Sequence, residues 1–185
     1  GVSDEGVYAA YARIIEAIGD CRLKVILYHI PQVSAVPLSL PLIGRLIAAF
    51  PDTVVGIKDS AGDLANMQAI AAAHPGFAVL AGADPLLLPL LQSGGAGCIT
   101  ATSNLIADSL RTVFDHTDDA ALVEPAQARI NAWRALSNSY VQIPTIKAMV
   151  GLKTGNAGWN RVRPPMLPLA AAQLAELEQK FAALP

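Results

Sequence analysis

Lys58 is the residue of this sequence best placed for covalent chemistry. It closes the β-branched, apolar run Thr53 to Ile57 and is followed at once by small and polar residues through Asp63. A lysine whose stem lies among valine and isoleucine is partly desolvated, which favours its neutral, nucleophilic amine. The alternative is a structural lysine whose ammonium reaches water from a strand end. The segment alone favours that alternative, so the choice depends on what lies beside Lys58.

Other residues able to do chemistry stand at the ends of other apolar runs. They are Tyr28 and His29 after a first run, Ser60 just after Lys58, Gly82 and Asp84 after a third run, and Ile99 in a fourth. In parallel α/β sheets ligands gather outside the carboxyl ends of the strands, so we expect these residues to share one rim. Schiff-base chemistry requires an amine to attack a ketone and a phenol to pass protons. The alternative for Tyr28 is a core tyrosine with a satisfied hydroxyl.

Four short apolar segments predict buried strands, and amphipathic segments between them predict helices. The predicted strands are 24–30, 54–58, 77–81 and 98–101, and the predicted helices are 3–18, 38–50, 63–74, 84–92 and 103–116. This alternation is typical of parallel βα units in an α/β fold. After about residue 120 only helices are predicted, over 122–136, 143–152 and 170–184, with a proline-rich connector at 156–168. We therefore expect a βα domain over 1–119 and a helical region over 120–185.

Cap residues and apolar spacing locate the ends and faces of these helices. Ser3, Asp63 and Asp84 are predicted N-caps, and Ser103 or Asn104 is predicted to cap the fifth helix. Pro89 is expected to distort the fourth helix. In the first helix, one apolar face is expected to hold Val7, Tyr11, Ile14, Ile15 and Ile18.

Composition narrows the function classes. Hydrophobic residues make up 53% of the chain and charged residues 15%, which suggests coverage by other elements or by partner subunits. No apolar run reaches the roughly 18 residues of a membrane span, and the start does not read as a signal peptide. Two isolated cysteines without metal-ligand spacing favour a reducing cytoplasm and no metal. A net charge of −2 without a basic run argues against nucleic-acid or membrane-surface partners. A nucleotide-binding doubly wound sheet is disfavoured because no glycine fingerprint follows the first strand.

Four motifs in register carry a family resemblance. They are Tyr28-His29-Ile30-Pro31, Gly56 to Asp63, Gly94 to Ile99, and Arg163-Pro164-Pro165. The sequence resembles the dihydrodipicolinate synthase/N-acetylneuraminate lyase family over essentially its whole length. The resemblance implies a (β/α)₈-barrel class I aldolase without cofactor or metal, usually a homotetramer, that binds pyruvate as an imine and reacts it with an aldehyde.

The resemblance also implies roles for individual residues. Lys58 matches the Schiff-base lysine and Tyr28 the proton-relaying tyrosine. Ile99 matches the residue beside the bound pyruvate, and Ser60, Gly82 and Asp84 fall at substrate-binding positions.

Departures from the family pattern refine the predicted activity. Val33 stands where dihydrodipicolinate synthases commonly have an arginine that grips the aldehyde's carboxylate, and valine cannot make that contact. Asp84-Pro85 replaces the Asp-Glu usual in sialic-acid lyases. We therefore expect a pyruvate-type aldolase or hydratase-aldolase of another specificity, with dihydrodipicolinate synthase itself as the alternative.

The number of predicted strands indicates that this chain holds only part of the family's barrel. Four of eight are found, matching the carboxyl-terminal half of the family barrel, and the hydroxyl-bearing loop that holds the pyruvate carboxylate has no counterpart. We expect the 185-residue chain to be a piece with an incomplete site. The alternative from another class is a non-catalytic half-barrel or assembly partner with exposed strand edges.

Overall fold

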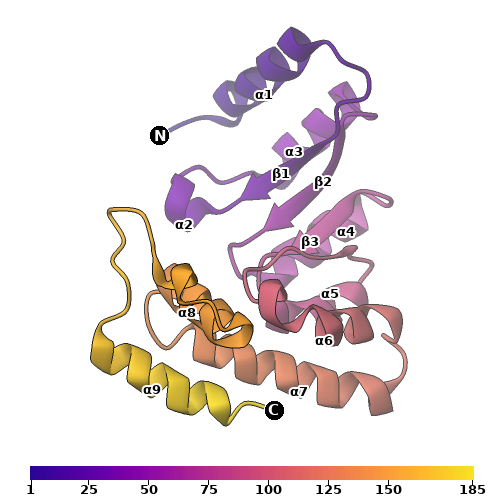
Figure 1. Cartoon of the computed structure of the whole chain (residues 1–185). Coiled ribbons are helices and arrows are strands. Elements are labelled where there is room, and N and C mark those ends of the chain that lie inside the picture. The colour runs from indigo at the N-terminus through magenta and orange to yellow at the C-terminus, as the bar shows by residue number, and fades with distance from the viewer. The chain divides into compact units, whose positions relative to one another are not determined.

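A four-stranded parallel sheet organises the first part of the chain. In the computed structural model, which describes all 185 residues, the strands run in the order β1-β2-β3-β4 (Figure 1). They are β1 (Val25–His29), β2 (Val54–Asp59), β3 (Ala78–Ala81) and β4 (Gly97–Cys98). The four predicted strands and their parallel pairing are confirmed, although β4 is shorter than predicted.

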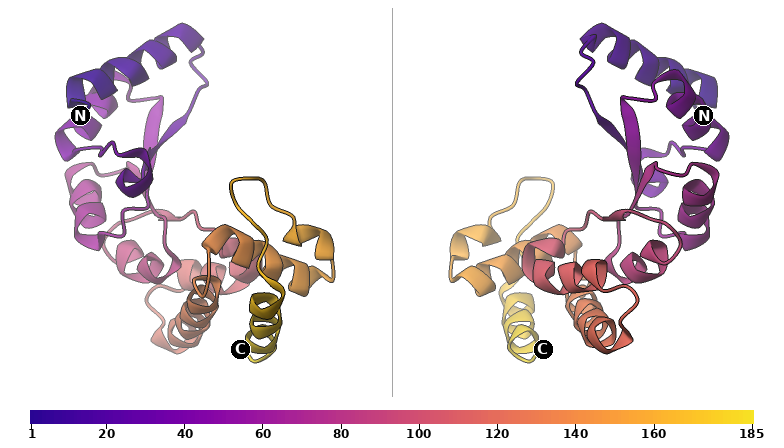
Figure 2. Two further views of the ribbon diagram at one scale, coloured as in Figure 1. Left: turned by 90° about the vertical axis from the view of Figure 1, so that its left-hand side faces the viewer. Right: turned by 90° about the vertical axis from the view of Figure 1, so that its right-hand side faces the viewer.

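Helices cover one side of this sheet. They are α1 (Asp4–Ile18), α3 (Leu40–Ala49), α4 (Leu64–Ala73) and α5 (Leu87–Leu91), with a short turn of helix, α2 (Pro31–Ser34), after β1 and a 3₁₀ turn, η1 (Asp84–Leu86), before α5. Figure 2 shows α3 and α4 along one side of the strands, with α1 packed against α3. Leucine, isoleucine and valine side chains from these helices and strands form a single core between helices and sheet. The other side of the strands carries no helix of this unit.

Alternation along the strands therefore separates two kinds of residue. Leu27, Ile57 and Val79 point toward the helices and are fully buried. Ile26 and Tyr28 point to the other side and are each 47% exposed. Because successive side chains of a strand point to opposite faces, the sheet has a helix-covered face and an open face. Lys58 lies on the open face, in register between Tyr28 of β1 and Leu80 of β3.

The predicted caps are confirmed at two helices. Ser3 Oγ accepts from Gly6 N at 3.3 Å, and Asp63 Oδ1 accepts from Asn66 N at 3.2 Å, so each satisfies a backbone donor of its first turn. Gly19 ends α1 with φ of 59°, a left-handed conformation that costs glycine little.

Other local predictions are wrong. Asp84 is not an N-cap: the predicted continuous helix is split into η1, whose N-cap is Ala83, and α5, whose N-cap is Leu86. The N-cap of the fifth helix is Thr102, not Ser103 or Asn104. Ile14 and Ile18 were expected on the apolar face of α1 but are more than half exposed. The face of α1 that packs on the core is formed by Val7, Ala12 and Ile15, with Tyr8 and Tyr11 partly buried beside them.

The second part of the chain is helical. It comprises α6 (Ser103–Asp115), α7 (Ala120–Ser137), α8 (Gln142–Thr154), a 3₁₀ turn η2 (Ala157–Asn160) and α9 (Ala171–Ala182). Trp133 of α7 packs edge-on against Phe181 of α9, with 5.4 Å between ring centroids. The three helices predicted after residue 120 are confirmed.

Two compact units result, Gly1–Ile99 and Thr100–Pro185. This geometric division assigns α6 to the second unit. The division at 119/120 separates βα sequence from purely helical sequence and stays a prediction. No helix is both long and apolar enough to cross a lipid bilayer.

Candidate functional site

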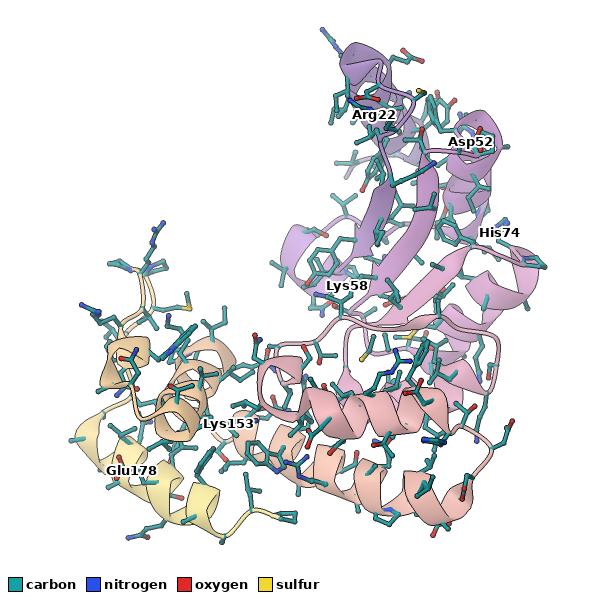
Figure 3. The ribbon with its side chains drawn as sticks, turned by 45° about the vertical axis from the view of Figure 1, so that its right-hand side comes forward. Arg22, Asp52, Lys58, His74, Lys153 and Glu178 are labelled. Carbon is teal, nitrogen blue, oxygen red and sulfur yellow. The ribbon has the colours of Figure 1, made fainter.

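Lys58 and Tyr28 meet on the open face of the sheet. They are partners in the β1–β2 register, so strand pairing alone places their side chains next to each other. Lys58 Nζ donates to Tyr28 Oη at 3.3 Å and lies 4.3 Å from the centroid of the phenol ring. Figure 3 shows Lys58 at the carboxyl end of the β2 strand. The amine and the phenol are therefore within proton-transfer distance of one another.

Ser60 joins this pair from the loop after β2. The pKa of Tyr28 lies below the ordinary value for tyrosine, chiefly because the nearby Ser60 hydroxyl favours the ionised form of the phenol. Partial burial acts against the shift, whereas the hydrogen bond and positive charge of Lys58 act with it. The phenol is thus shifted toward its ionised, proton-accepting form by two neighbours from β2 and its loop.

Gly82 fixes Ser60 from the opposite side. A Cβ on Gly82 would lie 2.1 Å from Ser60 Oγ, so the serine side chain occupies the space that any other residue would need. Gly82 N also donates to Asp59 O at 2.7 Å. Gly82, predicted to contact substrate, in this structure shapes the loop that bears Ser60.

Buried carboxylates lie behind the rim. Asp59 is fully buried and accepts from Ala61 N at 2.8 Å and from Asn66 Nδ2 at 2.9 Å, which orients the turn after Lys58. Asp84, predicted to bind substrate, is also fully buried. Burial, and secondly the charge of Asp84, raise the pKa of the Cys98 thiol to about 11. Asp84 is thus buried close to Cys98, and its role in substrate binding stays a prediction.

Ile99 and Val33 are the apolar residues of the rim. Ile99 extends β4 through a 2.9 Å bond from its N–H to Ala81 O and is 43% exposed. Val33 lies on α2 and is 76% exposed. Neither provides a charged contact at the rim.

One rim contact had no signal in the sequence. Gln32, on the short α2 turn, donates from Nε2 to Ser60 O at 2.7 Å. An exposed glutamine after a proline is unremarkable by residue type, and α2 itself was not predicted. No three His, Cys, Asp or Glu side chains come together in a way that could hold a metal ion.

A row of parallel βα units that carries a lysine–tyrosine pair at its carboxyl end is the arrangement of a (β/α)-barrel lyase of the class I aldolase type. Comparison with known proteins gives the same result. The Dihydrodipicolinate synthetase family matches residues 1–184. The chain belongs to this family, and the expected fold class, a partial (β/α)₈ barrel followed by helices, is confirmed.

Several relatives illustrate the match. An uncharacterised DapA-like lyase of Chloroflexus aurantiacus is 34% identical over 178 residues, which covers 96% of this chain and 59% of the relative. A 4-hydroxy-tetrahydrodipicolinate synthase of Chlorobium luteolum is 25% identical over 180 residues, covering 97% and 60%. The crystal structure of dihydrodipicolinate synthase from Agrobacterium tumefaciens superposes with a TM-score of 0.84 at 30% identity, covering all of this chain and 62% of that one. The chain thus spans about three fifths of the length of these relatives.

Proposed function

We propose that Lys58 forms an imine with a 2-oxo acid such as pyruvate, and that the protein to which this chain belongs joins or splits pyruvate and an aldehyde. The contact that carries this proposal is the 3.3 Å approach of Lys58 Nζ to Tyr28 Oη on the open face of the sheet. Family membership supports it, as do the lyase and synthase names of the relatives. Soluble cytoplasmic location and a homo-oligomeric state belong to the same proposal.

The chemistry assigns a separate role to each group. The neutral amine of Lys58 attacks the C2 carbonyl carbon, and the hydroxyl of the resulting carbinolamine leaves as water once Tyr28 has supplied a proton. The iminium then draws electrons from C3, which loses a proton to the Tyr28 phenolate. The resulting enamine attacks the aldehyde carbon, and the aldehyde oxygen takes a proton back from Tyr28. Water hydrolyses the imine of the product and restores the amine. Ser60, close to the phenol, favours the ionised form of Tyr28 that accepts protons in these transfers.

The rim residues favour an aldehyde without a carboxylate near α2. Val33 is exposed at the position where a carboxylate-binding arginine would stand, and valine has no donor for an anion. We therefore favour an aldolase or hydratase-aldolase over dihydrodipicolinate synthase. A panel of aldehydes offered with pyruvate, half of them acidic, tests this choice, and faster turnover of aspartate semialdehyde than of neutral aldehydes would reverse it.

Borohydride trapping tests the imine directly. Pyruvate and borohydride should leave a reduced 1-carboxyethyl group on Lys58, identified by peptide mass analysis of the longest available form of the protein. Lys58→Arg should abolish the adduct, and Tyr28→Phe should slow its formation by about 10²-fold, the usual scale of general acid–base catalysis. Lys24→Arg, at the opposite end of β1, is the matched control and should leave the adduct unchanged. An adduct on other lysines only would contradict the mechanism.

The alternative function is a non-catalytic half-barrel. Two observations support this alternative. One face of the sheet is open (Figure 2), and the chain spans only about three fifths of the length of the relatives. On the 185-residue chain alone we expect a weak or absent adduct, because the chain offers no paired hydroxyl loop for the pyruvate carboxylate. Trapping at full yield on this chain would show that its own residues suffice.

A further inference from the structure

One stretch of the helical unit carries positive side chains and no negative ones. No aspartate or glutamate stands between Glu124 and Glu176, whereas six lysines or arginines do, although the whole chain has a net charge of −2. The six are Arg129, Arg134, Lys147, Lys153, Arg161 and Arg163. A local excess of positive charge of this kind attracts anions.

Three of these cations line a single cavity. The cavity has a volume of about 440 Å³ and lies between α8 and the long connector that leads from η2 to α9 (Figure 1). Lys147 lines it from α8, and Arg161 and Arg163 line it from the connector. The other lining residues are Ile143, Val162 and Met166. The walls therefore combine three positive charges with apolar side chains.

The chain supplies no negative charge to this cavity. None of its three cations forms a salt bridge. Arg129 of the same stretch, by contrast, is paired with Asp108 at 3.0 Å. Glu176, the first acid after the connector, accepts hydrogen bonds from Tyr140 Oη and Lys180 Nζ. The three charges that face the cavity are thus left for a ligand to balance.

The η2 turn holds two of the cations in place. Arg161 Nε donates to Gly158 O at 3.3 Å. A Cβ on Gly158 would lie 3.2 Å from Arg161 Nη2, so the lack of a side chain there lets the guanidinium lie close to the turn. Lys147 Nζ lies 5.3 Å from the centroid of the Trp159 ring, which is a cation–π contact. Side chains that are already held lose less freedom when a ligand binds.

We propose that Lys147, Arg161 and Arg163 bind a small organic anion of the phosphomonoester class in this cavity. Planar guanidinium groups match the oxygens of a phosphate in pairs, and the lysine adds a further positive charge. The apolar side chains of Ile143 and Met166 suit a carbon body attached to the phosphate. The volume lies in the range of sites for small organic ligands. This site is independent of the proposed imine chemistry of the other unit.

Calorimetric titration with phenyl phosphate tests the site in the longest available form of the protein. At constant ionic strength we expect saturable binding that is tighter than the binding of inorganic phosphate, which lacks an apolar body, and of benzoate, which carries less charge. Equal affinity for phenyl phosphate and either of these two anions would overturn the ligand class. Absence of binding, as would follow if another segment of the protein filled the cavity, would overturn the site.

Substitution of each arginine should weaken this binding. Arg161→Gln and Arg163→Gln remove a charged donor, and each should raise the dissociation constant of phenyl phosphate by about tenfold, the usual scale for a hydrogen bond to a charged group. Arg163→Lys keeps the charge without the planar fork and should have a smaller effect. Circular dichroism melting verifies that the variants are folded. Unchanged affinity in both Arg161→Gln and Arg163→Gln would overturn the proposal.

Arg13→Gln is the matched control. Arg13 is an exposed arginine of α1 that forms no salt bridge, so its loss removes the same charge from outside the cavity. The affinity for phenyl phosphate should be unchanged in Arg13→Gln and in Lys58→Arg. An equal loss in Arg13→Gln would show that binding follows net charge alone. Loss of binding in Lys58→Arg would show that the anion binds at the Lys58 rim, and either result would overturn the proposal.

Discussion

The two faces of the sheet differ in what their residues do. On the helix-covered face, Leu27, Ile57 and Val79 lie under helices and have almost no exposed surface. On the open face, Ile26 and Tyr28 are each about half exposed, and Lys58 stands among them. The same strands supply both sets in strict alternation. Stability is thus concentrated on one face and chemistry on the other.

This contrast explains why Lys58 can be both held and reactive. Its backbone is fixed by a strand whose alternate side chains, Ile57 and Asp59, are fully buried. Its side chain projects from the opposite face, where Nζ donates to Tyr28 Oη at 3.3 Å. A rigid strand with an accessible amine is the support that a catalytic lysine requires.

Truncating one isoleucine on each face gives the largest expected effect. Ile57→Ala leaves a cavity in a core that cannot collapse easily, and should lower the free energy of unfolding by about 2–5 kcal/mol. Ile26→Ala removes a side chain that is already half exposed, and should cost about 1 kcal/mol or less. Urea unfolding followed by circular dichroism measures both. An equal loss in the two variants would mean that the open face is covered in solution, for example by a partner chain.

A methyl group at Gly56 tests how closely the strands pack beneath the open face. A Cβ there would lie 2.6 Å from Ala78 O, a backbone atom that cannot move without disturbing the β2–β3 pairing. Gly56→Ala should therefore destabilise the protein by about 1–3 kcal/mol. Gly6→Ala in α1 is the control, since its Cβ meets only side-chain atoms at 3.5 Å or more and alanine favours a helix. A neutral Gly56→Ala would show that the strands have room to separate.

Alkaline pH should change the free energy of unfolding in opposite directions through one residue of each face, Cys98 and Tyr28. This is the smallest of the expected effects. Burial raises the pKa of Cys98 from 9.0 to about 11. The protonated thiol therefore contributes to the free energy of unfolding fully below pH 9.0, and this contribution is lost as the pH rises toward about 11. The pKa of Tyr28 is lowered, so Tyr28 contributes stability that grows as the pH approaches the ordinary tyrosine value.

Because Cys98 is partly exposed, we expect ionisation of its thiol to lower the free energy of unfolding by about 1–2 kcal/mol. Urea unfolding at a series of pH values measures it. Cys98→Ala should flatten the fall above pH 9.0, and Tyr28→Phe should steepen it. Identical pH profiles for Cys98→Ala and the unaltered chain would contradict the assignment.

The sequence predicted the elements better than their ends and faces. The strands and most helices follow from β-branched runs and apolar spacing, and the caps at Ser3 and Asp63 follow from side chains that bond their own helix. Predictions failed where the outcome depends on distant partners. Ile14 is exposed because only one stripe of α1 meets α3, and Asp84 lies in a 3₁₀ turn buried beside Cys98, which no local pattern encodes.

The lysine–tyrosine pair could be proposed from the sequence because strand ends in a parallel sheet converge on one rim. Residue types and spacing alone thus determined the alternation of βα units, the lysine at the end of a buried strand, and the family. Tertiary structure decided the rest: that the register places Tyr28 opposite Lys58, that the Ser60 side chain fills the space in front of Gly82, and that Gln32 reaches the Ser60 carbonyl. The reason is that periodicity depends on the local chain, whereas register, close packing and side-chain contacts between loops depend on residues that only folding brings together.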